Sequence, residues 1–425
     1  MKSFISKKLL YKLLVPFLLG LGTMFSFFRE ITIAYYYGTS RDLEIFRIAF
    51  SIPYALFQSL GTVLVGALLP ILIHEGQGLI FQIKRQVQKI FIIIAIIAAL
   101  TTTWQAKILA PGFSSIELET LSINLLICWM ILVISAFIFP IRLLLQEQNR
   151  KMIVSSTSLF YALSFIVFIF IFNNTFGKYD LSILAVASTS FVFLIYKIFS
   201  SVNTIIEKPQ KSQVLDKKIK QIILGSFVYV LFLAVPRLID KAVASKMDIG
   251  VIANLEYAMN FYVAFGVLIG TSFTIIYAKK IALEYRDNLS LLWIFKIVGV
   301  PFLLAAIVSL LIFPFSEDLV RLAYLRGKFT ENNIMDVVEI LQWFLFALPL
   351  MVSGMILLQV VAAYSIFILI GLAMIKSIVK LSWVIYFSST STLAIFGQST
   401  FIMEFTAIII MSFLFFNKKR QKTFK

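Results

Sequence analysis

Four charged side chains lie in or beside apolar stretches near the start of the chain. Arg29 and Glu30 fall inside the first stretch that could cross a membrane, and Glu44 and Arg47 stand at the mouth of the second. A charge at membrane depth costs at least ~2.5 kcal/mol, so such groups persist where they pair or face a watery cavity. A planar guanidinium grips phosphate oxygens through two parallel hydrogen bonds. We therefore expect this hairpin to line a polar space suited to an anionic substrate.

The second half of the chain carries charges in similar positions. Arg237 is followed by the end of a predicted span, a short loop and Glu256, as Arg29 is followed by Glu44. Two halves that enter the membrane from the same side are related by an axis along the membrane normal, as in some transporters. Such a parallel repeat predicts that helices of both halves surround one central opening. The predicted cavity residues are Arg29, Glu30, Glu44, Arg47, Arg237, Asp240, Glu256 and Asn260.

Two interpretations of these charges stay open. Buried charges are generally paired, so they could steady helix packing, for example through a bond between Arg29 and Glu44. Alternatively, the guanidinium groups face a cavity and take an anionic substrate. Both can hold, because a salt bridge in one state can release its arginine in another.

Other charges within predicted spans receive no substrate role. Lys376 and Lys380 lie one helical turn apart, and snorkelling toward the membrane surface, or a span misplaced by one turn, is the favoured explanation. Glu404 and Lys296 are isolated in the sequence, so neither is given a function.

The composition is that of a membrane protein. Of 425 residues, 60% are hydrophobic and 14% are charged, which leaves too little polar surface for a soluble domain. Apolar runs long enough to span a bilayer recur along the chain. We predict an all-α polytopic membrane protein with about 12 transmembrane helices in two six-helix lobes. The predicted spans are 13–36, 43–73, 89–105, 120–145, 151–172, 181–202, 221–240, 251–278, 291–314, 336–362, 364–386 and 398–416.

The distribution of basic residues predicts the orientation. Lys and Arg are concentrated in alternate short loops and in both tails, which predicts that both termini are cytoplasmic. The net charge of +17 therefore orients the chain in a membrane and does not indicate a nucleic-acid partner. A basic segment at 207–220 is the only soluble-looking linker, and it separates a lobe at 1–206 from a lobe at 221–425.

The sequence lacks the motifs of the common enzyme classes. Cys128 is the single cysteine and His74 the single histidine, so no disulfide and no Cys/His metal cluster can form within the chain. There is no Walker loop, no HExxH helix and no nucleophile elbow. We therefore expect a transporter without a cofactor, driven by the membrane potential or an ion gradient.

Ordered short motifs resemble the MurJ/MviN family, the bacterial lipid II flippases of the MOP exporter superfamily. Most lie in the first two predicted spans, and two lie in the second half. They are Phe28-Arg29-Glu30, Tyr37-Gly38, Glu44, Ala49-Phe50 with Ile52-Pro53, Leu69-Pro70 before Glu75, Glu256-Tyr257-Ala258 and Arg326-Gly327-Lys328-Phe329-Thr330.

The resemblance implies a V-shaped bundle of two lobes in the bacterial inner membrane. A cationic central cavity would take the diphosphate-sugar head of an undecaprenyl-linked precursor and pass it outward by alternating access. Arg29 would match a cavity arginine and Glu44 the acidic residue near it. Membrane lipids are the other expected partners, and a monomer is expected.

The chain departs from the family pattern in two ways. Two further cavity arginines of the family would fall at about Phe57 and Asn260, and neither residue is basic. The lipid II flippases are similar to this chain with two more C-terminal helices added, so twelve spans look more like Wzx-type flippases of polysaccharide repeat units.

Two other functions stay open. A cation-coupled antiporter similar to the MATE branch of the superfamily would be expected to have an acidic cavity, whereas acids and arginines are mixed here. A membrane scaffold without transport activity in a cell-envelope complex is a third class.

Overall fold

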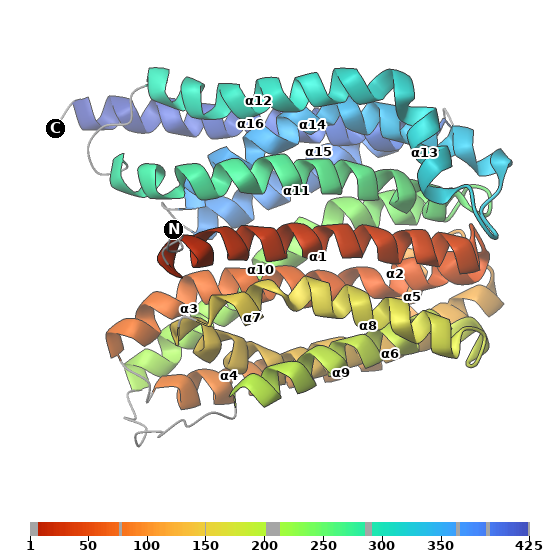
Figure 1. Cartoon of the computed structure of the whole chain (residues 1–425), viewed down its shortest axis with the longest axis horizontal. Coiled ribbons are helices and arrows are strands. Elements are labelled where there is room, and N and C mark those ends of the chain that lie inside the picture. Colours follow the sequence, from red (N-terminus) through yellow and green to blue (C-terminus); the bar gives the residue numbers. More distant parts are fainter. Residues whose placement is uncertain are drawn as a thin grey trace, which may run out of the picture. The chain divides into compact units, whose positions relative to one another are not determined.

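Figure 1 shows the computed structural model of the chain, which describes residues 7–75, 79–148, 150–200, 213–284, 291–362, 366–387 and 392–423. Within these ranges the regular secondary structure is helical, without a strand. Ten of the helices described there are long and apolar enough to cross a membrane. The number is eleven if α4 (Leu79–Leu100) and α5 (Thr102–Leu109) form one bent span. The all-α membrane fold is therefore confirmed, whereas the count of twelve spans and the cytoplasmic termini are not.

Two predicted spans are interrupted. The span expected at 151–172 is divided at Ser156 into α7 (Lys151–Ser155) and α8 (Thr157–Phe172), and α8 alone has only 16 residues. A helix needs about 20 residues to cross the hydrocarbon core. α4 and α5 meet at Thr101 with a bend of 72°. The Thr101 hydroxyl donates to the Ile97 carbonyl at 2.9 Å, which satisfies one of the groups that the bend frees.

The chain divides into two compact units, Met1–Ala234 and Val235–Lys425. α10 (Gln213–Ala244) runs across the division. Part of the predicted linker at 207–220 lies outside the described residues, so the predicted lobe boundaries stay a prediction.

In the first unit, α6 (Ser115–Glu147) is the central helix. A capping box starts it: the Ser114 side chain accepts from the Glu117 amide, and the Glu117 carboxylate accepts from the Ser114 amide at 2.7 Å. Because apolar residues lie on every side of α6, it buries several faces at once. α1 (Lys7–Tyr37) packs beside α8, which also lies against α9 (Figure 1). The neighbours of α6 are α2 (Arg41–Ala55), α3 (Gly61–Glu75), α4, α5 and α9 (Asp180–Ser200).

In the second unit, α14 (Ile334–Ala362) has the corresponding place. α6 and α14 are the fourth predicted spans of the two halves, and each has an internal proline, Pro140 and Pro349. The shared role agrees with a repeat of the two halves. The neighbours of α14 are α11 (Val251–Glu284), α12 (Leu291–Ile312), α13 (Ser316–Tyr324), α15 (Ile366–Phe387) and α16 (Ala394–Thr423). Short 3-10 turns cover Gly177–Tyr179, Phe313–Phe315 and Glu331–Asn333.

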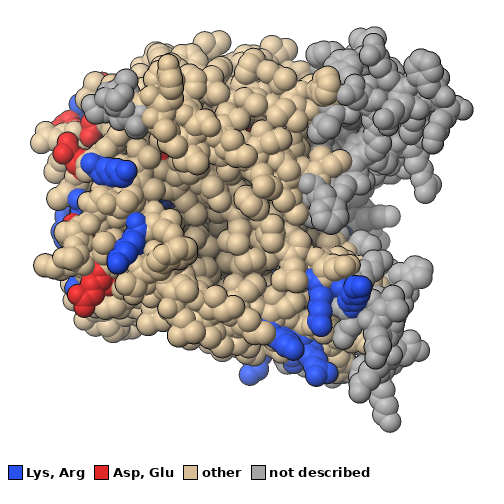
Figure 2. All heavy atoms as spheres, turned by 180° about the vertical axis from the view of Figure 1, so that it is seen from behind, with Lys and Arg blue, Asp and Glu red and all other residues tan. Residues whose placement is uncertain are grey.

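The surface has the charge distribution of a membrane protein. On the face in Figure 2, the described Lys, Arg, Asp and Glu side chains gather toward two ends, and the band between them is almost free of such charges. Large apolar side chains are exposed on the spans, including Ile97, Leu310 and Ile385. Such a band suits contact with lipid tails.

Candidate functional site

The first cluster of charges is built by α1 and α2. α1 ends at Tyr37, and Gly38 takes a left-handed backbone conformation (φ 58°) that lets the chain leave the helix. The Ser40 side chain then accepts a hydrogen bond from the Leu43 amide and caps the start of α2. This short connection brings Arg47 of α2 to Arg29 and Glu30 of α1.

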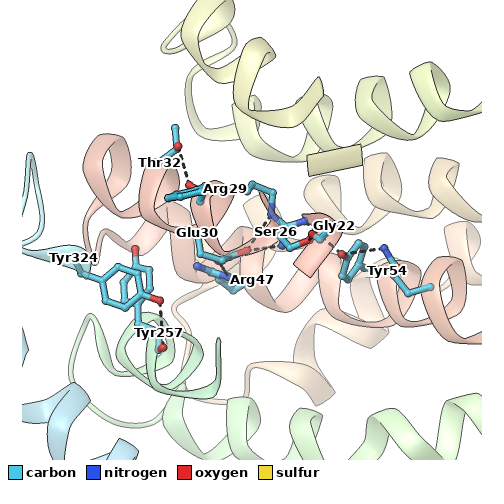
Figure 3. Close-up of polar contacts among 11 residues, drawn as sticks. Gly22, Ser26, Arg29, Glu30, Thr32, Arg47, Tyr54, Tyr257 and Tyr324 are labelled. Carbon is cyan, nitrogen blue, oxygen red and sulfur yellow. Dashed lines mark hydrogen bonds and ion pairs between the residues drawn. The ribbon is translucent and has the colours of Figure 1, made fainter. Parts of the chain in front are cut away.

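Glu30 binds both arginines of this cluster (Figure 3). Its Oε1 lies 2.5 Å from Nη2 of Arg29, and its Oε2 lies 2.5 Å from Nη1 of Arg47. All three residues are buried, with exposed fractions of 7%, 3% and 6% for Arg29, Glu30 and Arg47. Two guanidinium groups thus share one carboxylate, and these three side chains together carry one net positive charge.

Aromatic rings surround the Arg29 guanidinium. Its central carbon lies 5.5 Å from the ring centre of Tyr54 and 5.6 Å from those of Tyr161 and Phe165. Arg29 Nη1 also donates a long hydrogen bond of 3.4 Å to the Tyr54 hydroxyl. Ring faces attract a cation by about 0.5–2 kcal/mol each and leave its N–H edges able to bind an anion. α2 and α8 therefore hold the guanidinium in place without neutralising it.

Glu44 belongs to a different contact from the one considered in the sequence. Arg29 pairs with Glu30, so the suggested pair of Arg29 with Glu44 is wrong. Arg41, one turn before Glu44 on α2, bonds Glu44 Oε2 at 2.7 Å and Glu117 Oε1 at 2.9 Å. The Arg41 guanidinium also lies 4.6 Å from the Phe113 ring centre. Sequence reasoning missed Arg41, because it stands in a loop-like stretch before the predicted span.

In the second unit, each of the two predicted acids pairs with a lysine. Asp240 is fully buried and bonds Lys380 at 2.6 Å, whereas Glu256 bonds Lys241 at 2.5 Å. Arg237 is exposed and forms no ion pair within the described part of the chain. The Asn260 amide nitrogen is buried and has no hydrogen-bond partner among the described residues. Whether all eight predicted residues line one chamber stays a prediction.

The two lysines of α15 do not snorkel. Lys380 is 1% exposed, and besides Asp240 it donates to the Thr400 hydroxyl at 2.8 Å. Lys376 bonds both carboxylate oxygens of Glu404, at 2.9 and 2.8 Å. The span predicted at 364–386 is correctly placed. The two lysines stay inside the bundle because they form ion pairs with carboxylates of α10 and α16. Glu404 is thus not isolated, and the Lys296 side chain lies outside the described residues.

One basic residue that sequence reasoning gave no role lies within α6, near the end of the span predicted at 120–145. Arg142 stands beside a small cavity of about 20 Å³. Phe57, where the family resemblance leads one to expect an arginine, is 6% exposed and lines the same cavity. The signal that could have found Arg142 is the apolar run around it, which continues past 145.

The fold is similar to the folds of solved helical membrane transporters. It matches a lipid II flippase MurJ solved in an inward closed conformation, with a TM-score of 0.82 and 17% identity over 94% of this chain and 87% of that one. It also matches an inward-facing multidrug resistance MATE family transporter of the MOP superfamily, with a TM-score of 0.70 and 16% identity over 96% of this chain and 94% of that one.

The sequence narrows this class to one family. The family described as lipid II flippase MurJ matches residues 33–425. A probable lipid II flippase MurJ from Aquifex aeolicus (strain VF5) is 24% identical over 367 residues, which cover 80% of this chain and 70% of that protein. The chain belongs to the MurJ lipid II flippase family, as the ordered motifs of its sequence indicated.

Proposed function

We propose that the chain carries an undecaprenyl-diphosphate-linked saccharide across the bacterial cytoplasmic membrane by alternating access. The observation that carries the proposal is the buried cluster of Arg29, Glu30 and Arg47. A phosphate group offers the charge and the oxygen geometry that a guanidinium binds best. The family match supports the lipid-linked saccharide as the substrate class.

Within this proposal, Glu30 holds the side chains of Arg29 and Arg47 in position between transport cycles. A buried guanidinium without an opposite charge is costly, so a resident carboxylate stabilises the empty site. A diphosphate carries more negative charge than one carboxylate and can draw Arg29 away from Glu30. The aromatic rings of Tyr54, Tyr161 and Phe165 leave Arg29 in position for that exchange.

Complementation in cells tests the function and separates the two substrates. The chain is expressed in one strain depleted of its lipid II flippase and in another that lacks its flippase for polysaccharide repeat units. Rescue of the first indicates lipid II, and rescue of the second indicates a polysaccharide precursor. Arg29→Ala should lose the rescue, whereas Lys107→Ala, at an exposed position of α5, should keep it at equal membrane levels. Failure to rescue either strain, or full rescue by Arg29→Ala, would contradict the proposal.

A cation-coupled antiporter is the second candidate, because the fold also matches a multidrug resistance transporter. The net positive charge of the cluster around Glu30 favours an anion over a cation. Resistance of cells to cationic dyes on expression of the chain would support the antiporter instead.

A further inference from the structure

We propose that Arg142 is a second binding residue for the diphosphate, reached before Arg29 on the way out of the cell. This inference rests on the proposed function, and it names a contact that the sequence motifs do not include. Arg142 lies on α6, six residues before the capping residue Gln148 at the end that is predicted to be cytoplasmic.

Arg142 has no acidic partner within the described residues. Its side chain makes one hydrogen bond there, from Nη2 to the Thr62 hydroxyl at 3.3 Å. Its Nε is buried and has no hydrogen-bond partner. This differs from Arg29, which Glu30 neutralises in part. A guanidinium inside a bundle without a counter-charge is costly, which is the condition expected of a group that binds an anionic ligand.

The guanidinium lies close to the backbone of the neighbouring helix α3. A Cβ atom at Gly61 would lie 2.6 Å from Arg142 Nη1, so a larger residue there would require the flexible end of the Arg142 side chain to move. Just before Gly61, residues Leu56–Leu60 form a π-helical turn, a feature often found at functional sites. The cavity of about 20 Å³ beside Arg142 has room for about one water, so a phosphate cannot enter it. An anion must instead meet the Nη2 edge, where Thr62 is exposed.

A line of hydrogen bonds connects Arg142 to Arg29. Tyr54, Gln58 and Thr62 follow at four-residue spacing along α2, the π-helical turn and α3. The Gln58 side-chain amide donates to the Tyr54 hydroxyl at 3.1 Å, and the Thr62 hydroxyl donates to the Gln58 backbone carbonyl at 3.4 Å. Arg29 donates to Tyr54 at one end, and Arg142 donates to Thr62 at the other.

The length of the polar line from Tyr54 to Thr62 indicates that the diphosphate makes two successive contacts. Thr62 follows Tyr54 by eight positions, which is about two helical turns. The two guanidinium groups thus contact this helix about two turns apart, which favours two separate contacts with the ligand. The diphosphate therefore meets Arg142 first, passes the hydroxyl and amide groups between, and reaches Arg29 in the outer half of the span.

Binding of soluble diphosphates to the purified full-length chain tests the inference. The probes are farnesyl diphosphate and inorganic pyrophosphate in detergent, with phosphatidylglycerol in nanodiscs as a separate anionic lipid. Arg142→Gln should weaken both diphosphates about tenfold, the loss expected for one charge-assisted contact. The affinity of Arg142→Lys for both diphosphates should lie between those of the wild type and Arg142→Gln. Lysine keeps the positive charge but lacks the two parallel N–H groups of the guanidinium.

Two further variants separate binding from folding. Gly61→Ala keeps every charge and favours the helix, yet it displaces the guanidinium, so binding should weaken several-fold without a lower melting temperature. Lys197→Gln removes an exposed charge from the end of α9 and should change neither property.

The outcomes distinguish this inference from the proposed function. Wild-type binding of the diphosphates with unchanged affinity in Arg142→Gln would overturn the role of Arg142 and leave the proposed function standing. Loss of phosphatidylglycerol binding alone would assign Arg142 to ordinary membrane lipid and also overturn the inference. No binding of either diphosphate to the wild-type chain would contradict the proposed function itself.

Discussion

At the scale of single residues, the stability of the helix bundle depends on how its buried charges are paired. Glu30 forms ion pairs with two arginines, and Asp240 forms one with Lys380. Each of these two acidic residues is at most 3% exposed. Removing one member of such a pair is far more damaging than replacing both, because the remaining charge keeps its desolvation cost.

Lys380 offers a direct test of that rule. Lys380→Met leaves the Asp240 carboxylate buried without its ammonium and should destabilise the protein by about 3–5 kcal/mol. Lys380→Met combined with Asp240→Asn should recover much of the loss. The Lys376 side chain is 21% exposed, so Lys376→Met should lower the free energy of unfolding by less than Lys380→Met does. Thermal unfolding in detergent compares the stability of the wild type with that of these three variants. Equal losses of stability in Lys380→Met and in the double variant would refute the pairing.

The ring of Tyr161 should matter through its face and not through its hydroxyl. The hydroxyl is buried without a hydrogen-bond partner, whereas the ring lies 5.6 Å from the Arg29 guanidinium. Tyr161→Phe should therefore transport at the wild-type rate, and Tyr161→Leu should be slower by about fivefold, from a lost cation–π contact of about 1 kcal/mol. Initial rates of lipid movement in proteoliposomes check this prediction. Slow movement by Tyr161→Phe together with fast movement by Tyr161→Leu would indicate that the hydroxyl matters and the ring face does not.

The residue types were more predictable than their partners. Arg29, Glu30 and Arg47 are visible in the sequence as charges in apolar runs, and the structure joins them. The Lys380–Asp240 pair was not foreseen, because its members are 140 residues apart and a single sequence carries no sign of such contacts. Arg142 was missed because a charge near a predicted span end looks like part of a loop.

At the scale of helices, close packing depends on a few glycines. A Cβ atom at Gly397 of α16 would lie 2.1 Å from the Trp343 Cβ of α14, while nothing lies within 4 Å of a Cβ at Gly371 of α15. Gly397→Ala should therefore force α16 from α14 and lower the melting temperature. Gly371→Ala should leave it equal or higher, because alanine favours the helix by about 1 kcal/mol. A melting temperature that rises in both variants would contradict the packing described for Gly397.

Hydropathy predicted the positions of most helices but not their breaks. The division at Ser156 and the 72° bend at Thr101 fall inside predicted spans, each in a short cluster of Ser and Thr residues. Neither site contains proline or glycine, so the Ser and Thr clusters at 155–158 and 101–103 are the local signals of a break, and they are weaker ones. α5 packs against α6, and α8 packs against α1 and α9, contacts that a periodicity argument does not include.

At the scale of the whole molecule, each of the two compact units has one central helix, α6 or α14, and each of these is the fourth predicted span of its half. This correspondence agrees with a repeat of the two halves, and the repeat itself stays a prediction. A protein that moves a negatively charged lipid head outward also gains from the membrane potential, which contributes about 2.3 kcal/mol per charge per 100 mV.

Transport should accordingly depend on voltage. In proteoliposomes, a potassium gradient with valinomycin that makes the interior negative should speed the movement of a diphosphate-linked lipid from the inner to the outer leaflet. Reversing the gradient should slow it several-fold. Rates that are equal at both polarities would exclude the potential as the energy source and leave an ion gradient.

The central claim is that the Arg29 cluster recognises a diphosphate during passage across the membrane. The direct measurement is the initial rate of flipping for two matched lipids, one with its sugar on a diphosphate and one with the same sugar on a neutral ether. The account predicts that the wild-type chain prefers the diphosphate lipid and that Arg29→Ala moves both at the same slow rate. Equal movement of the two lipids by the wild-type chain, or an undiminished preference in Arg29→Ala, would contradict it.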